Sequence, residues 1–144
     1  MNKSVIEWLD CTVQKYGNKK AFFDEKNDIT FSKFNEYTKS VGTYIHALLP
    51  QQTPVLVMCG RNVFTPACFL GIVRAGCFYA PVDGTMPHHR LNQIIGVIKS
   101  PLMVVDKENL ETAKQLEFDG QIVVLEDIIN TPSDEKCWWK QHKT

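Results

Sequence analysis

Few side chains in this sequence of 144 residues have the type and spacing that catalysis requires. The adjacent histidines His88 and His89 could suggest a metal site, but neighbouring helix positions point about 100° apart, and no cysteine or acidic side chain is spaced to complete the site. Cys68 and Cys77 could suggest a thiol nucleophile, but both have apolar neighbours, which do not favour the reactive thiolate. We interpret the histidines as exposed residues at a helix start and the thiols as buried and unreactive.

Two polar pairs next to predicted strands are the remaining candidates for ligand contact. Arg61 and Asn62 follow an apolar run, at the edge where parallel sheets usually bind ligands, although a solvated loop is the interpretation we favour. Asp83 and Arg90 flank a strand-to-helix turn and could form an ion pair that fixes it, with substrate contact as the alternative. The sequence contains neither G-x-x-x-x-G-K nor G-x-G-x-x-G, the patterns typical of phosphate loops. We therefore predict no catalytic, nucleotide-binding or metal-binding residue in this chain.

These residues are positioned by one stretch, residues 65–98. Thr65 is the predicted N-cap of a helix, and Pro66 suits its first turn because that position needs no N–H donor. The helix is apolar almost all round, which predicts burial on more than one side. Gly76 is expected to end it in the left-handed backbone conformation, which glycine adopts readily.

A strand and a second helix follow in the same stretch. Residues 77–82 form a short apolar run that predicts a buried strand, with Pro81 at its end because proline donates no hydrogen bond to a sheet. Thr85 or Met86 is predicted to cap the next helix. That helix has an apolar stripe at helical spacing, made of Leu91, Ile94, Ile95 and Ile98.

The whole chain alternates between apolar runs and amphipathic segments. Continuous apolar runs predict four buried strands, at residues 55–59, 77–82, 102–105 and 122–125. Helices lie between them, one of them capped by Asp106, and a helix, a small hairpin and a longer amphipathic helix precede them. This alternation predicts an α/β fold, a largely parallel sheet with helices on both faces. We expect residues 1–130 to form one α/β domain and 131–144 to form a polar tail that carries Trp138 and Trp139.

The overall composition excludes several classes of protein. The 16 basic and 16 acidic side chains balance, so the chain has no net charge to attract nucleic acid or an anionic membrane. No apolar run approaches the roughly 20 residues of a membrane span, and Glu7 and Asp10 interrupt the region where a signal peptide would be apolar. Five cysteines without a Cys-x-x-Cys pattern are typical of reduced thiols, so we expect a cytoplasmic protein.

Residues 73–83 also resemble a known family pattern. Their sequence, Val-Arg-Ala-Gly-Cys-Phe-Tyr-Ala-Pro-Val-Asp, is similar to L-K-A-G-x-A-Y-V-P-I-D of the adenylate-forming enzymes. That superfamily includes amino-acid adenylation domains, acyl-CoA and aryl-CoA ligases and luciferases. The positions that match outright are Ala75, Gly76, Tyr79, Pro81 and Asp83.

Two shorter matches flank this one in the expected order. Residues 87–91 resemble the P-x-x-R-L that follows in amino-acid adenylation domains, with Pro87 and Arg90 matching. Residues 29–34 are similar to the family's L-T-Y-x-E-L, where Thr30 matches and a lysine stands at the acidic position. Acyl-CoA ligases more often have Asn-Pro after the strand, so the resemblance leans towards amino-acid activation.

The resemblance implies the N-terminal α/β subdomain of an AMP-forming ligase, closest to the adenylation domains of nonribosomal peptide synthetases and to D-alanine–carrier protein ligases. It implies that the full-length protein uses ATP and Mg²⁺ to adenylate a carboxylic acid, favouring an amino acid, and passes the acyl group to the thiol of a carrier protein or of CoA. The matching residues would have structural roles. The family's Ser/Thr/Gly-rich phosphate loop and its C-terminal lid are not found in the sequence, so we expect this chain alone to be an inactive scaffold.

Other interpretations remain open from the sequence. The chain could belong to an acyl-CoA ligase, or be a stand-alone homologue without catalysis that binds a partner, or, on the βα alternation alone, a small flavodoxin-like ligand-binding protein. Strands that need cover on both faces, together with tryptophans in a polar tail, predict exposed apolar surface. We therefore also expect self-association, as a two-fold homodimer through the last strand or the tail.

Overall fold

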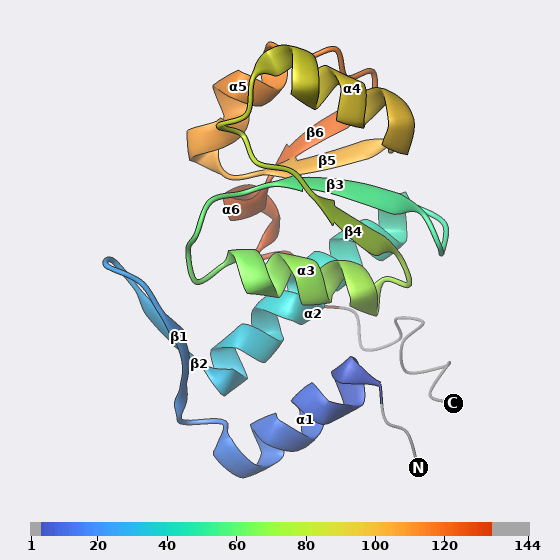
Figure 1. Ribbon diagram of the computed structural model, residues 1–144. Helices are drawn as coiled ribbons and strands as arrows, with labels where there is room; N and C mark the ends of the chain where they lie inside the picture. Colours follow the sequence, from blue (N-terminus) through green and yellow to red (C-terminus); the bar gives the residue numbers. More distant parts are fainter. Residues whose placement is uncertain (1–3, 134–144) are drawn as a thin grey trace.

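The computed structural model describes residues 4–133, which form an α/β fold (Figure 1). In chain order its elements are α1 (Val5–Tyr16), β1 (Lys20–Phe23), β2 (Asp28–Thr30), α2 (Phe31–Leu48), β3 (Pro54–Met58), α3 (Thr65–Arg74), β4 (Phe78–Pro81), α4 (His88–Ile98), β5 (Leu102–Val105), the short 3-10 helix η1 (Lys107–Asn109), α5 (Leu110–Lys114), β6 (Gln121–Val124) and α6 (Leu125–Ile128). Trp138 and Trp139 lie outside the described residues, so the predicted role of the tail stays a prediction.

The centre of the fold is a parallel sheet with the strand order β4-β3-β5-β6. Val57 of β3 lies opposite Pro81 of β4 on one side and Val104 of β5 on the other. Helices α2, α3 and α6 cover one face of the sheet, and α4 and α5 cover the other (Figure 1). The strands lie where the apolar runs predicted them, and the predicted α/β architecture is confirmed.

Alternation along β3 divides the core into two layers. Val55 and Val57 pack with α2 and α3, while Leu56 and Met58 pack with α4 and α5, and all four are buried. Side chains of a strand alternate between the two faces of its sheet, so a strand that is covered on both sides is apolar at every position. This is why the central strands are recognisable in the sequence.

Strand β4 departs from the prediction of a buried strand. It lies at the edge of the sheet, paired with β3, and the side chains of Phe78 and Tyr79 are 53% and 40% exposed. An apolar run does not distinguish a central strand from an edge strand, because strand order depends on contacts between segments distant in the sequence. Pro81 ends the strand, as predicted.

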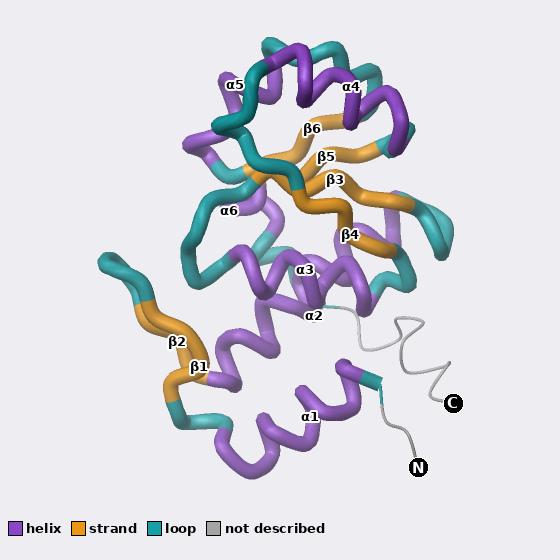
Figure 2. The backbone as a smooth tube through the Cα atoms, in the orientation of Figure 1, coloured by secondary structure: helices purple, strands orange, loops and turns teal. Residues whose placement is uncertain are grey.

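The N-terminal segment forms a further layer. The predicted hairpin is present, since β1 and β2 pair in antiparallel fashion with Phe23 opposite Asp28. Figure 2 shows α1 and this hairpin on the side of α2 and α3 that faces away from the sheet. A small core joins the layer to α2 and α3, made of Leu9, Ile29, Phe34, Val63 and Ala67.

The start of α3 differs from the prediction that Thr65 caps it. Thr65 is the first residue of the helix, and the N-cap is Phe64, which makes no capping hydrogen bond with its side chain. Asn62, two residues earlier, accepts hydrogen bonds at its Oδ1 from the N–H groups of Phe64 and Thr65 at 2.9 and 3.1 Å. The Thr65 hydroxyl instead donates to the carbonyl of Gly60 at 2.7 Å. Asparagine and threonine side chains can both accept from nearby backbone N–H groups, and the loop conformation decides which one reaches them.

The start of α4 was also predicted too early. The helix begins at His88 after Pro87, and neither Thr85 nor Met86 caps it. The Asp83 carboxylate accepts hydrogen bonds from the backbone N–H and the hydroxyl of Thr85, at 2.9 and 2.7 Å. Thr85 therefore closes the turn after β4 and does not reach the helix.

Gly76 has a φ of 78°, which confirms the predicted left-handed conformation at the end of α3. Its N–H donates to the carbonyl of Val73 at 3.0 Å, and its own carbonyl accepts from the N–H of Gln52 at 2.7 Å. The left-handed turn thus joins the end of α3 to the loop before β3. Across residues 4–133, no helix is long and apolar enough to cross a membrane.

Candidate functional site

The carboxyl ends of the four parallel strands meet at one edge of the sheet, where α/β proteins usually bind ligands. Asp106, which follows β5, is buried at this edge and joins two of its loops. One of its carboxylate oxygens accepts from the Gly60 N–H at 2.7 Å, and the other accepts from the backbone N–H and side-chain amide of Asn109 at 3.0 and 2.7 Å. Asp106 caps the 3-10 helix η1, whereas the predicted helix α5 that follows has Asn109 as its N-cap, and the same Asp106 carboxylate fixes the loop after β3.

Cys59 is the cysteine at this edge, directly after β3. The pKa of its thiol is raised far above the ordinary value, first by a hydrogen bond with Cys68, then by burial and by the charges of Cys68, Asp106 and Glu126. A raised pKa keeps the thiol neutral, and a neutral thiol is a poor nucleophile. Cys68 and Cys77 are both buried, as the sequence predicted.

The residues of the turn after β4 do not converge on a site. No ion pair joins Asp83 and Arg90 within the described chain, because Asp83 is engaged by Thr85, whose hydrogen bonds lower the pKa of the Asp83 carboxyl. His88, His89 and Arg90 are exposed at the start of α4, as predicted for the histidines. Their side chains are available to solvent.

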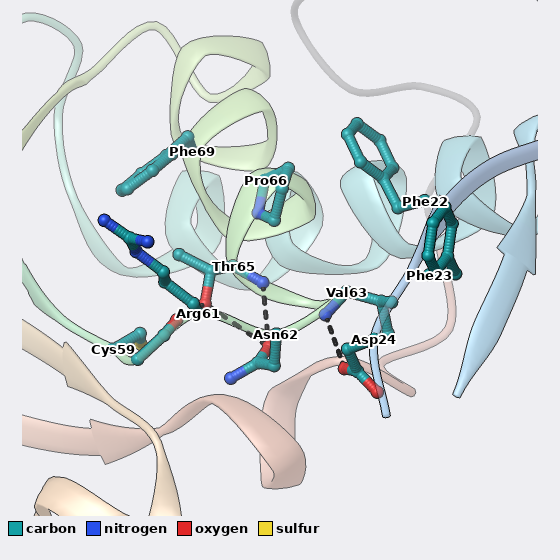
Figure 3. A pocket seen from close by; sticks show the side chains of 11 residues that line it. Phe22, Phe23, Asp24, Cys59, Arg61, Asn62, Val63, Thr65, Pro66 and Phe69 are labelled. Carbon is teal, nitrogen blue, oxygen red and sulfur yellow. Dashed lines mark hydrogen bonds between the residues drawn. The ribbon is translucent and has the colours of Figure 1, made fainter. Parts of the chain in front are cut away.

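A cleft of about 530 Å³ opens between the hairpin and the start of α3 (Figure 3). Phe22 and Phe23 of β1 lie on one side of it, and Pro66 and Phe69 of α3 lie on the other. Residues 59–63, in the loop from β3 to α3, also line the cleft, so the predicted pair Arg61 and Asn62 lies there. The lining is predominantly apolar.

Side chains bind the N–H groups of the three residues at the entry to α3, which borders the cleft. The Asp24 carboxylate accepts from the Val63 N–H at 3.0 Å, and Asn62 holds those of Phe64 and Thr65. A triphosphate needs several free backbone N–H groups together with a cation. Within residues 4–133 no three His, Cys, Asp or Glu side chains converge on a metal position either.

The residues that match the family patterns lie at turns and element ends. Thr30 caps α2, accepting an N–H from its first turn at 3.2 Å. Ala75 and Gly76 end α3, with Ala75 fully buried. Tyr79 lies on β4 and stacks on Phe69, with ring centroids 4.4 Å apart. Through this stack one matching residue supports a wall of the cleft.

The other matching residues form the connection from β4 to α4. Pro81 ends the strand, Asp83 closes the turn, and Pro87 is the residue before the helix. Arg90 lies in the first turn of α4 with an exposed side chain. None of these four lines the cleft.

Arg74 is a buried cation that sequence reasoning missed. It ends α3 and is fully buried. Its Nε donates to Thr38 Oγ1 at 2.9 Å, and one Nη donates to Asn35 Oδ1 at 2.6 Å and to Asp10 Oδ1 at 3.0 Å. These bonds join α3 to α2 and α1. The charge of Arg74 by itself suggests a solvated helix end, which is why its burial was missed. The sequence signal that could have indicated the burial is its position in the family pattern, directly before Ala-Gly.

Comparison with known proteins identifies the family. Residues 9–143 match the family of AMP-binding enzymes, and the chain belongs to this family. Nonribosomal peptide synthetase kk1B of Curvularia clavata is 26% identical over 127 residues, which cover 88% of this chain and 1% of that protein. D-alanine–D-alanyl carrier protein ligase of Lactiplantibacillus plantarum is 27% identical over 113 residues, which cover 78% of this chain and 22% of that ligase.

Solved structures share the fold. The N-terminal subdomain of Klebsiella oxytoca NpsA, in complex with 3-hydroxyanthranilyl-AMSN, superposes with a TM-score of 0.82 at 14% identity, covering 95% of this chain and 35% of that one. VinN superposes with a TM-score of 0.80 at 15% identity, covering 89% of this chain and 35% of that one. The resemblance to adenylate-forming enzymes and the fold it implied are confirmed. The chain spans only a minor part of each relative's length.

Proposed function

We propose that this chain is the N-terminal portion of an AMP-forming ligase that activates an amino acid and passes it to the thiol of a carrier protein. The observation that carries the proposal is the agreement of pattern and fold: the matched residues of 73–91 lie at the end of α3, on β4 and in the turn to α4. Support for an amino acid comes from relatives that are a nonribosomal peptide synthetase and a D-alanine–D-alanyl carrier protein ligase.

In this proposal the chain acts as a scaffold for chemistry done by other parts of the protein. The reaction joins a carboxylate to the α-phosphate of ATP with release of pyrophosphate, and a thiol then accepts the acyl group. The described residues hold the carboxyl edge of the sheet in place, through the Asp106 bonds to Gly60 and Asn109. The proposal includes a cytoplasmic location, where ATP is available and free thiols such as Cys68 stay reduced.

Exchange of pyrophosphate into ATP, dependent on the added acid, tests the proposal. The protein expressed from its complete gene and the 144-residue chain are each assayed with a panel of amino acids and of acyl and aryl acids. We expect exchange with an amino acid from the complete protein, and none above a heat-inactivated control from the 144-residue chain.

The other outcomes would change the assignment. Exchange with acyl or aryl acids alone would assign the protein to the acyl-CoA ligases. A complete protein without any exchange would support a binding module that lacks catalysis. Exchange by the 144-residue chain itself, abolished by a point substitution within it, would disprove the scaffold role.

A further inference from the structure

We propose that the cleft between the hairpin and α3 binds an aromatic or branched-chain monocarboxylate. The apolar part of the ligand lies against Pro66 and Phe69, and its carboxylate pairs with Arg61. This site goes beyond the proposed function, because all its residues belong to this chain and no nucleotide is involved.

The walls of the cleft are aromatic and held in place by neighbouring rings. Phe69 stacks on Tyr79 at 4.4 Å between centroids, and Phe22 packs against Phe34 at 4.8 Å. Phe23 is 81% exposed at the rim, so its ring is available for contact with an apolar ligand. The volume of about 530 Å³ is in the range of small-molecule sites, which are mostly apolar with a few polar groups.

Arg61 supplies the positive charge. Figure 3 shows its side chain extending on the Phe69 side of the cleft, opposite Phe22 and Phe23. No ion pair of Arg61 forms within residues 4–133. A guanidinium presents a planar fork of N–H groups that matches a carboxylate, so this is the ligand group that the cation accommodates best.

Asp24 is the acidic residue of the lining, and it is held by backbone donors. Its carboxylate accepts from the N–H groups of Lys26 and Asn27, both at 2.8 Å, and of Val63 at 3.0 Å. These three bonds lower the pKa of Asp24, which therefore stays ionised at neutral pH. A ligand with two negative charges would meet this fixed negative charge, whereas a monoanion can place its single charge on Arg61.

Asn62 binds two of the backbone N–H groups beside the cleft. Its Oδ1 occupies the N–H groups of Phe64 and Thr65, which a phosphate at the start of α3 would need. The same two bonds fix the orientation of the amide. The positive group that the cleft offers a carboxylate is therefore the Arg61 guanidinium.

Titration of the 144-residue chain with phenylacetate, followed by ¹H–¹⁵N NMR, tests the site. Phenylacetamide, which has the same ring and no charge, is the matched ligand. We expect saturable shifts in the amides of residues 22–24 and 59–66, and weaker binding of phenylacetamide. Arg61→Gln should weaken phenylacetate binding by roughly threefold to fivefold, the strength of an exposed ion pair, and leave phenylacetamide unchanged.

Two further variants separate the site from general effects. Phe23→Ser should weaken both ligands, because it removes apolar contact at an exposed position. Arg90→Gln removes an exposed cation outside the cleft and should change neither. Absence of saturable shifts, equal binding of acid and amide, shifts confined to other surfaces, or an Arg61→Gln protein that binds phenylacetate unchanged would each overturn the proposal.

Discussion

Replacement of Arg74 by methionine tests the buried junction of α1, α2 and α3. Methionine keeps an unbranched apolar stem of similar reach but removes the guanidinium. The change deprives Asn35 Oδ1, Thr38 Oγ1 and Asp10 Oδ1 of a donor. Wild-type stability depends on these bonds because Arg74 is fully buried and its charge is compensated by protein groups.

The expected loss follows from how well each partner can recover. Asp10 is 36% exposed, so its carboxylate can turn to water at little cost. Thr38 keeps the hydrogen bond that its hydroxyl donates to the Asn35 carbonyl at 2.7 Å. Asn35 Oδ1 remains buried without its 2.6 Å partner, and an unsatisfied buried acceptor costs about 1–3 kcal/mol. With the lost charged hydrogen bonds to the other two groups, we expect Arg74→Met to lower the free energy of unfolding by about 2–4 kcal/mol.

Urea denaturation followed by circular dichroism measures this loss. Arg90→Met, at an exposed position, is the matched control and should stay within about 0.5 kcal/mol of wild type. Adding Asn35→Leu to Arg74→Met should recover part of the loss, because it removes the unsatisfied acceptor. An Arg74→Met protein as stable as the Arg90→Met control would refute the reasoning that this network holds the three helices together.

Three further predictions follow from other features. Gly76→Ala should lower the free energy of unfolding by about 1 kcal/mol or more, because alanine is strained at a φ of 78°, and an unchanged urea midpoint at equal slope would contradict this. Hydrogen bonds lower the pKa of Asp24, so its contribution to stability is present at neutral pH and is lost as the pH falls below about 4 towards the lowered pKa. Asp24→Asn should therefore flatten the acid side of a plot of urea midpoint against pH. The same acid-side slope in both proteins would count against this prediction. Self-association remains a prediction. Light scattering across a concentration series should show a dimer, and the double substitution Trp138→Ser/Trp139→Ser should weaken that dimer. A constant monomer mass in both proteins would exclude self-association.

The sequence alone determined the features that depend on local periodicity and backbone preference. The runs that became β3, β5 and β6 are apolar at successive positions because both faces of the sheet are covered, so their pattern records burial directly. Gly76 was recognisable because its left-handed conformation strains other residues. The family could be named because its pattern lies in one continuous stretch, residues 73–83.

Only the tertiary structure decided which segments become neighbours. Strand order placed β4 at the edge of the sheet, so an apolar run that predicts burial became partly exposed at Tyr79. The cleft joins the Asp24 turn to the start of α3, and its Asp24–Val63 hydrogen bond spans 39 residues of sequence. Arg74 is buried because α1 and α2 present three acceptors to it, and a charged side chain at a helix end carries no local sign of such partners. Local patterns show which elements are apolar, whereas the extent to which an element is covered, and by which residues, depends on how distant segments pack.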